Sequence, residues 1–109
     1  MVPNIVTGSY TGNAAAQNIS LGFVPDYIRV VNITDGTISW EWFSGMAAAS
    51  AFQTANHDTA QQSVISSNGI TAYEGSDAGD TKGFTVGTAL STDTKVFRYV
   101  AMRSGPGGA

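Results

Sequence analysis

The feature that most constrains this chain is a two-residue alternation of apolar and polar side chains, broken by glycine, proline and short turn-forming runs. Successive side chains of a β-strand point to opposite faces, so this period indicates half-buried strands. The 3.6-residue period of an amphipathic helix is nearly absent. Candidate strands recur at spacings of about 8 to 12 residues, as in β-sandwiches. We therefore predict an all-β fold, an antiparallel β-sandwich with a jelly-roll-like arrangement of about 7 to 8 short strands.

The clearest pair of predicted strands is a hairpin. The runs Tyr27–Ile33 and Ile38–Phe43 flank Asp35-Gly36, and Asp-Gly between two apolar runs favours a tight turn whose two central residues have positive φ. We predict further strands at Asn4–Thr11, Ile19–Phe23, Gln62–Ser66, Ile70–Glu74, Gly83–Thr88 and Lys95–Arg103.

Two predicted segments differ from this simple alternation. Lys95–Arg103 has apolar residues on both faces, with Phe97 on one and Val100 on the other, which is typical of a central or covered strand. Gly45–Asp58 is rich in alanine but has no clear amphipathic stripe, so it is either a short helix or an extended arm that contacts a neighbouring subunit. We expect residues 1–103 to form a single domain and residues 104–109, with three glycines and a proline, to form a flexible tail.

Composition limits the possible partners. Charged residues make up only 12% of the 109 residues, about half of the roughly 25% of an average soluble protein. Interface cores are depleted in charge, so this scarcity favours a surface that is partly covered by partners. The net charge of −3 argues against nucleic-acid binding. The cations form no dense run: Arg29, Lys82, Lys95, Arg98 and Arg103.

The sequence also argues against cysteine-dependent sites, membrane spans and a classical export signal. With no cysteine there is no disulfide, no thiolate zinc site and no cysteine nucleophile. No apolar run approaches the 18 or so residues of a membrane span, and the opening Met-Val-Pro-Asn is unlike an export signal. We expect a soluble protein with no membrane partner.

The sequence holds no well-supported catalytic or metal-binding pattern. The single histidine, His57, lies beside Asp58, but no Gly-x-Ser-x-Gly elbow accompanies it. Glu41 and Glu74 lie on or beside strands without any sign that they face each other across a cleft. Asp77 and Asp80 offer oxygen ligands for calcium, yet their spacing fits no calcium-loop pattern and a solvated turn is favoured. We predict no enzymatic activity, no catalytic residue, no metal site and no cofactor.

Three further patterns have structural interpretations. Gly83–Gly87 lacks the Lys-Ser/Thr of a phosphate loop, so its glycines are interpreted as bulges or close backbone contacts. The glycosylation sequons at Asn18 and Asn32 fall within predicted strands and are interpreted as coincidental. Trp40, Trp42 and Phe43 form either a stacking platform for sugar rings or part of a core face, and the alternation of Ile38, Trp40 and Trp42 favours the core.

Several short motifs together resemble a group of small bacteriophage virion proteins. A Gly-Phe-x-Pro-Asp phrase precedes a β-branched strand, a Gly-Phe-Thr-x-Gly strand follows later, and an Ala-x-Arg sequence closes the pattern. The matching segments are Gly8–Asn13, Leu21–Asn32, the tryptophan strand ending at Gly45-Met46, Ser67–Tyr73, Gly83–Gly87 and Arg98–Arg103. They cover roughly residues 8 to 103 and specify turns and strand ends.

The resemblance implies a non-enzymatic structural protein of the virion. The expected role is that of a capsid decoration, or cement, protein on the phage head surface, made in the host cytoplasm. Such a protein bridges and stabilises major capsid subunits and is often a homotrimer. The alternative is a tail- or fibre-associated module that binds a receptor or carbohydrate. The family brings no catalytic motif with it.

Overall fold

The computed structural model describes residues 4–55, 61–73 and 82–103. They form eight β-strands and one short 3₁₀ turn, with every strand pair antiparallel, so the all-β prediction is confirmed. The strands are β1 (Ile5–Thr11), β2 (Gln17–Ser20), β3 (Tyr27–Asn32), β4 (Ile38–Phe43), β5 (Ser50–Ala55), β6 (Gln61–Tyr73), β7 (Gly83–Val86) and β8 (Val96–Met102). The 3₁₀ turn, η1, spans Thr88–Leu90.

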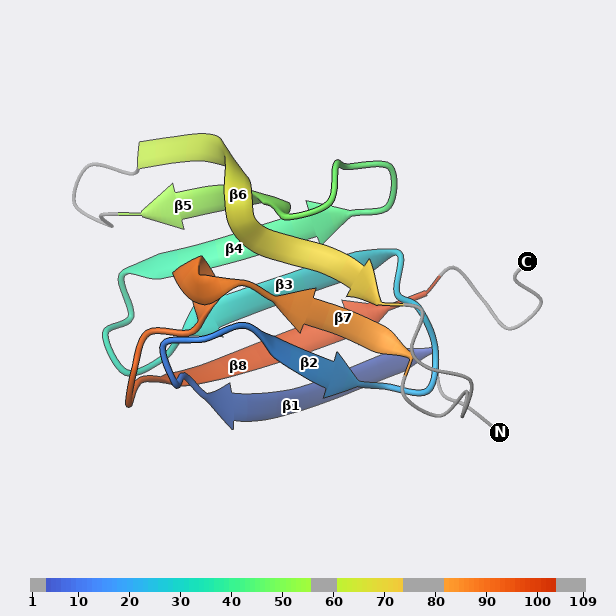
Figure 1. Cartoon of the computed structure of the whole chain (residues 1–109), viewed down its shortest axis with the longest axis horizontal. Helices are drawn as coiled ribbons and strands as arrows, with labels where there is room; N and C mark the ends of the chain where they lie inside the picture. The colour runs from blue at the N-terminus through green and yellow to red at the C-terminus, as the bar shows by residue number, and fades with distance from the viewer. Residues whose placement is uncertain (1–3, 56–60, 74–81, 104–109) are drawn as a thin grey trace.

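All eight strands belong to one sheet, in the order β1-β8-β3-β4-β5-β6-β7-β2. The sheet curls so that β7 and β2 lie over β3 and β8, and the core is enclosed between these two parts (Figure 1). The eight strands form one curled sheet, and both the sandwich and its jelly-roll-like arrangement stay predictions.

The predicted β3–β4 hairpin is confirmed, but its turn is longer than expected. The strands pair from Tyr27 opposite Phe43 to Val31 opposite Ser39. Only Gly36 of the Asp35-Gly36 pair has a positive φ, at 70°, so the two-residue turn was the wrong interpretation. The buried Asn32 explains the difference, because its side-chain oxygen accepts hydrogen bonds from the backbone N–H groups of Thr34 and Asp35 and shapes a longer loop.

The Gly45–Asp58 segment is neither a helix nor an arm over the part that is described. Residues 50–55 form β5, which is hydrogen-bonded between β4 and β6 inside the sheet. Small alanine and serine side chains suit this place, and Gln53 accepts a hydrogen bond from the indole N–H of Trp40 at 2.9 Å. Sheet pairing and packing override the helical preference of alanine. Residues 56–58 lie outside the described residues.

A single long strand, β6, replaces the two strands predicted at Gln62–Ser66 and Ile70–Glu74. Its first half pairs with β5 and its second half with β7. Asn68 adopts a positive φ of 61°, and the pairing with β5 shifts register between Ser50 and Ala51. A Cβ on Gly69 would lie 2.6 Å from the carbonyl oxygen of Ser50. Glycine therefore permits the close approach at which β6 bends from one layer to the other.

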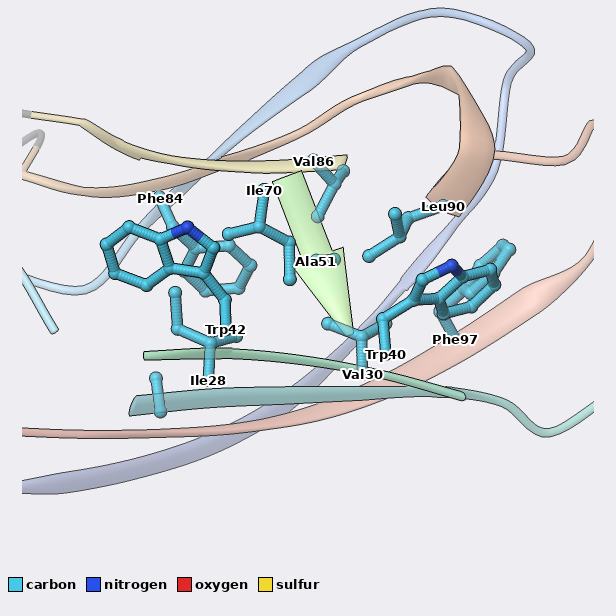
Figure 2. Packing of buried hydrophobic residues seen from close by; sticks show 11 residues of the cluster. Ile28, Val30, Trp40, Trp42, Ala51, Ile70, Phe84, Val86, Leu90 and Phe97 are labelled. Carbon is cyan, nitrogen blue, oxygen red and sulfur yellow. The ribbon is translucent and has the colours of Figure 1, made fainter. Parts of the chain in front are cut away.

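Aromatic and branched side chains fill the space between the two layers (Figure 2). Trp40 and Trp42 of β4 are 1% and 4% exposed, so the core interpretation of these two tryptophans is confirmed. The other members of the buried cluster are Ile28, Val30, Ala51, Ile70, Phe84, Val86, Leu90, Phe97 and Ala101.

Candidate interaction face

The opposite side of the central strands forms a surface that we call the outer face. It faces away from the layer that contains β7 and β2 (Figure 1). Its members alternate along β3, β4 and β8 with inward-facing core residues, and along β1 with half-buried ones. They are Ile5, Thr7, Ser9 and Thr11 of β1, Val96, Arg98, Val100 and Met102 of β8, Tyr27, Arg29 and Val31 of β3, Ser39, Glu41 and Phe43 of β4, Phe52 and Thr54 of β5, and Gln62 and Val64 of β6.

Much of the outer face is apolar. Strand register places Ile5, Met102, Tyr27 and Phe43 side by side across four strands. Ile5 is 58% exposed and Phe43 is 48% exposed. Val64, in register with Phe52 on the next strand, is 63% exposed. These three are among the four large hydrophobic side chains that are exposed in the described part of the chain, the fourth being Ile33.

The charge of the outer face is locally positive although the chain is acidic overall. Arg29 and Arg98 lie at diagonal positions on neighbouring strands, because Arg29 pairs with Val100 and Arg98 with Val31. Both arginines are exposed, and neither has an ion-pair partner among the described residues. Glu41 is the one carboxylate on this face, opposite Arg29. The surface is therefore suited to an apolar partner that also carries carboxylates.

Two shallow depressions adjoin on the outer face. The larger, of about 340 Å³, is lined by Thr7, Arg29, Val31, Arg98, Tyr99 and Val100. The smaller, of about 180 Å³, shares Arg29 and Val31 with it and extends toward the β3–β4 turn. Together they give the face a hollow centre with two guanidinium groups, suited to side chains of another protein rather than to an enclosed small molecule.

Glu41 is held by a hydrogen bond at the edge of the apolar row. The Tyr27 hydroxyl donates to its carboxylate at 2.7 Å. Burial, together with this hydrogen bond, raises the pKa of Tyr27 to about 12. The Tyr27 ring also packs against Phe43, with ring centroids 5.2 Å apart. Glu41 thus has a structural partner, and no second carboxylate among the outer-face residues faces it as a glycosidase would require.

Most of the other residues considered for chemistry lie outside the described part of the chain. These are His57, Asp58, Glu74, Asp77 and Asp80. Among the described residues, no group of three or more His, Asp or Glu side chains is placed to hold a metal ion. No helix in the described ranges is long and apolar enough to cross a membrane.

The glycine and sequon interpretations can be compared with the structure. A Cβ on Gly83 would overlap the carbonyl oxygen of Ile19, and one on Gly87 would overlap Asn68, so their interpretation as close backbone contacts is confirmed. Asn32 is 3% exposed and bonds within its own turn, which leaves no room for a glycan. Asn18 is exposed on β2 and accepts a hydrogen bond from Thr85.

Sequence reasoning did not identify the outer face, although one signal pointed to it. Apolar residues on both sides of Lys95–Arg103 predicted a central or covered strand. The strand β8 is indeed central, between β1 and β3. No described element covers its outer side, where Val96, Val100 and Met102 are half-buried by their neighbours. The second apolar face therefore marks a surface rather than a second core.

Comparison with known proteins adds no relative. No protein-family model matches the chain, and neither a curated protein nor a solved structure is similar enough to be matched.

Proposed function

We propose that this protein is a non-enzymatic structural component of a phage virion, a capsid decoration protein that binds the major capsid protein through its outer face. The virion setting comes from the resemblance in strand-end and turn motifs. The observation that carries the proposal is the concentration of exposed apolar side chains, Ile5, Phe43 and Val64, on one face with few charges. An exposed apolar area with a polar surround is typical of a protein-binding surface.

The mechanism of such a protein is mechanical. A capsid presents the same surface many times, and a decoration protein that contacts adjacent subunits holds them together against the pressure of packaged DNA. Standard contacts of about 800 Å² per partner are sufficient when many copies bind one lattice. The two arginines on the outer face favour a capsid surface that carries carboxylates.

The alternative is a carbohydrate-binding module of the tail, and its sugar-stacking residues cannot be the two tryptophans. With Trp40 and Trp42 buried, Tyr27 and Phe43 form an aromatic pair on the described surface that could stack on a sugar. This pair is part of the same outer face, so the two functions predict different ligands for one surface.

The decisive experiment is to measure the copy number and position of the protein in purified particles. A decoration protein is present in hundreds of copies on heads, and particles that lack it release DNA at a lower temperature. A few copies confined to the tail, together with retention on a glycan array, would contradict the proposal and support the alternative.

Matched variants connect this result to the outer face. Replacing Phe43 and Val64 by Ser is expected to reduce retention on stripped heads, because it removes apolar contact area. Lys82→Ser, an exposed position beside β7 in the other layer, is the control and is expected to bind like the unmodified protein. Equal retention of all variants would exclude the outer face as the capsid-binding surface.

A further inference from the structure

The strand β1 lies at one border of the sheet, and its free edge is unusually unprotected. The sheet order leaves one side of β1 without a neighbouring strand among the described residues, and β1 forms the lower border of the molecule in Figure 1. Natural edge strands are kept from pairing by charged residues, proline, bulges or shortness. The sequence of β1, Ile-Val-Thr-Gly-Ser-Tyr-Thr, has seven residues with no charge and no proline, in unbroken register with β8.

The hydrogen bonds at the two ends of β1 show which residues face the free edge. The backbone N–H of Gly12 donates to the backbone carbonyl of Lys95, and the backbone N–H of Arg103 donates to the backbone carbonyl of Asn4. Residues of an antiparallel ladder alternate between bonding to their neighbour and pointing away from it. Even-numbered residues of β1 therefore bond to β8. The odd-numbered residues Ile5, Thr7, Ser9 and Thr11 direct their backbone N–H and C=O groups outward.

The sequence of β1 is nearly symmetric about Gly8. Hydroxyl residues Thr7 and Ser9 flank it, the apolar Val6 and Tyr10 come next, and β-branched Ile5 and Thr11 lie at the ends. If a second copy is placed antiparallel with a two-fold axis at Gly8, Thr7 meets Ser9 of the other copy in a hydrogen-bonded pair. Thr–Ser pairs of this kind are favourable, and two uncharged strands meet without repulsion.

We propose that β1 pairs with β1 of a second copy of this chain, joining two curled sheets edge to edge about a two-fold axis at Gly8. The backbone N–H and C=O groups of Ile5, Thr7 and Ser9 that point outward have no hydrogen-bond partner among the described residues. The pairing supplies these partners. The carbonyl of Thr11 already accepts a hydrogen bond from Gln17 at 2.9 Å, so the pairing is strongest across Thr7 and Ser9. An antiparallel two-fold contact closes at two copies, so this pairing predicts a dimer and not the trimer that the resemblance implies. This inference does not depend on the proposed function.

Amide exchange measured by NMR at rising protein concentration tests the pairing directly. The amides of Val6, Gly8 and Tyr10 bond to β8 and are expected to exchange slowly at every concentration. The amides of Thr7 and Ser9 are expected to change from fast to slow exchange as the dimer forms. A chain that stays monomeric at millimolar concentration, or an assembly of any size whose Thr7 and Ser9 amides still exchange fast, would overturn the proposal.

Variants at Thr7 separate pairing from folding. Thr7→Pro removes an outward N–H that the β1–β8 ladder does not use, and proline is tolerated at such edge positions. Dimer affinity measured by sedimentation is expected to fall at least about tenfold, because each copy loses one hydrogen bond. Thr7→Val keeps the N–H and loses only the side-chain hydroxyl, so its dimer affinity is expected to fall less than that of Thr7→Pro.

A second substitution covers the case in which Thr7→Pro does not fold. Thr7→Lys changes an exposed side chain and places a charge at the edge, which is a common natural protection against strand pairing. It is expected to weaken the dimer while leaving the amides of Val6 and Gly8 protected. Dimerisation of Thr7→Lys at unchanged affinity would contradict edge pairing.

Discussion

The two faces of the central strands differ in how deeply their side chains are buried and in how many partners those side chains have within the molecule. On the inner face, Trp40 and Phe97 are buried and lie 6.0 Å apart between ring centroids. On the outer face of the same strands, Phe43 is half exposed, and Arg98, which directly follows Phe97, has no ion-pair partner among the described residues. The inner face thus holds the fold together, whereas the outer face leaves apolar and charged side chains exposed.

The comparison also changes how the low charge content is understood. A chain with few charges could owe this to a large core alone. Here, however, apolar side chains continue onto a surface, where Ile5 and Val64 are each more than half exposed. Exposed apolar side chains grouped on one face indicate an interaction surface, whereas scattered ones carry no such meaning.

The largest expected difference between the faces concerns two aromatic residues of β4. Trp40→Ala should lower the free energy of unfolding by about 3 to 5 kcal/mol, because it opens a cavity in the core. Phe43→Ala removes only the packing against Tyr27 and should cost about 1 kcal/mol or less. Denaturant unfolding of both variants measures the difference. Similar losses for the two would mean that the outer face is also part of the stabilising core.

The next effect is a loss of stability in alkali. Burial raises the pKa of Tyr10 and Tyr99, and burial with the Glu41 hydrogen bond raises that of Tyr27 to about 12. Unfolded tyrosines ionise near pH 10, so the folded state binds more protons above that pH. The contribution is therefore fully present below about pH 10 and, for Tyr27, is lost as the pH rises through about 12.

Thermal unfolding between pH 8 and pH 12 measures this loss of stability. Tyr10→Phe, on the inner side, should flatten the decline more than Tyr27→Phe, because Tyr10 is the more deeply buried of the two phenols. A decline that both variants leave unchanged would show that other groups cause it.

A smaller difference is expected near neutral pH between the same two tyrosines. The hydroxyl of Tyr10 donates to the carbonyl of the buried residue Leu90 at 2.8 Å, so Tyr10→Phe leaves that acceptor without its partner and should cost about 1 to 2 kcal/mol. The Glu41 carboxylate, only half-buried on the outer face, can bond to water in Tyr27→Phe, which should change the free energy of unfolding by about 0.5 kcal/mol or less. Equal costs in urea unfolding would contradict this distinction.

The comparison of faces also explains what could be predicted from the sequence. Alternation predicted the strands β1, β3, β4 and β8, and in β4 it also predicted that Trp40 and Trp42 point into the core. It did not show which of the two apolar faces of β8 is buried. Alternation did not predict the strand β5 within Gly45–Asp58. The small residues there fit an interior strand of the sheet but show no apolar–polar alternation. The bend in β6 depends on the approach of Gly69 to Ser50, a contact between segments distant along the chain.

The candidate site could be predicted only in part for the same reason. The sequence shows that Val100 and Arg98 share a side of their strand, but not that Arg29 lies diagonally beside Arg98. That proximity depends on the order of strands in the sheet, in which β8 inserts between β1 and β3. Strand order is a property of tertiary pairing, which local alternation does not encode.

The smallest effect on stability is expected for Arg98→Thr. The side chain is exposed, has no ion-pair partner among the described residues and lies diagonally from another arginine, while threonine suits a strand. The free energy of unfolding should therefore change by no more than about 0.5 kcal/mol. Lys95→Thr is the matched control, because it breaks a 3.2 Å ion pair with Asp35 and should cost up to about 1 kcal/mol. A larger loss for Arg98→Thr than for Lys95→Thr would mean that the Arg98 guanidinium stabilises the fold.

Unchanged stability of Arg98→Thr together with weaker retention on capsids would instead mean that the positive charge of the outer face contributes to binding.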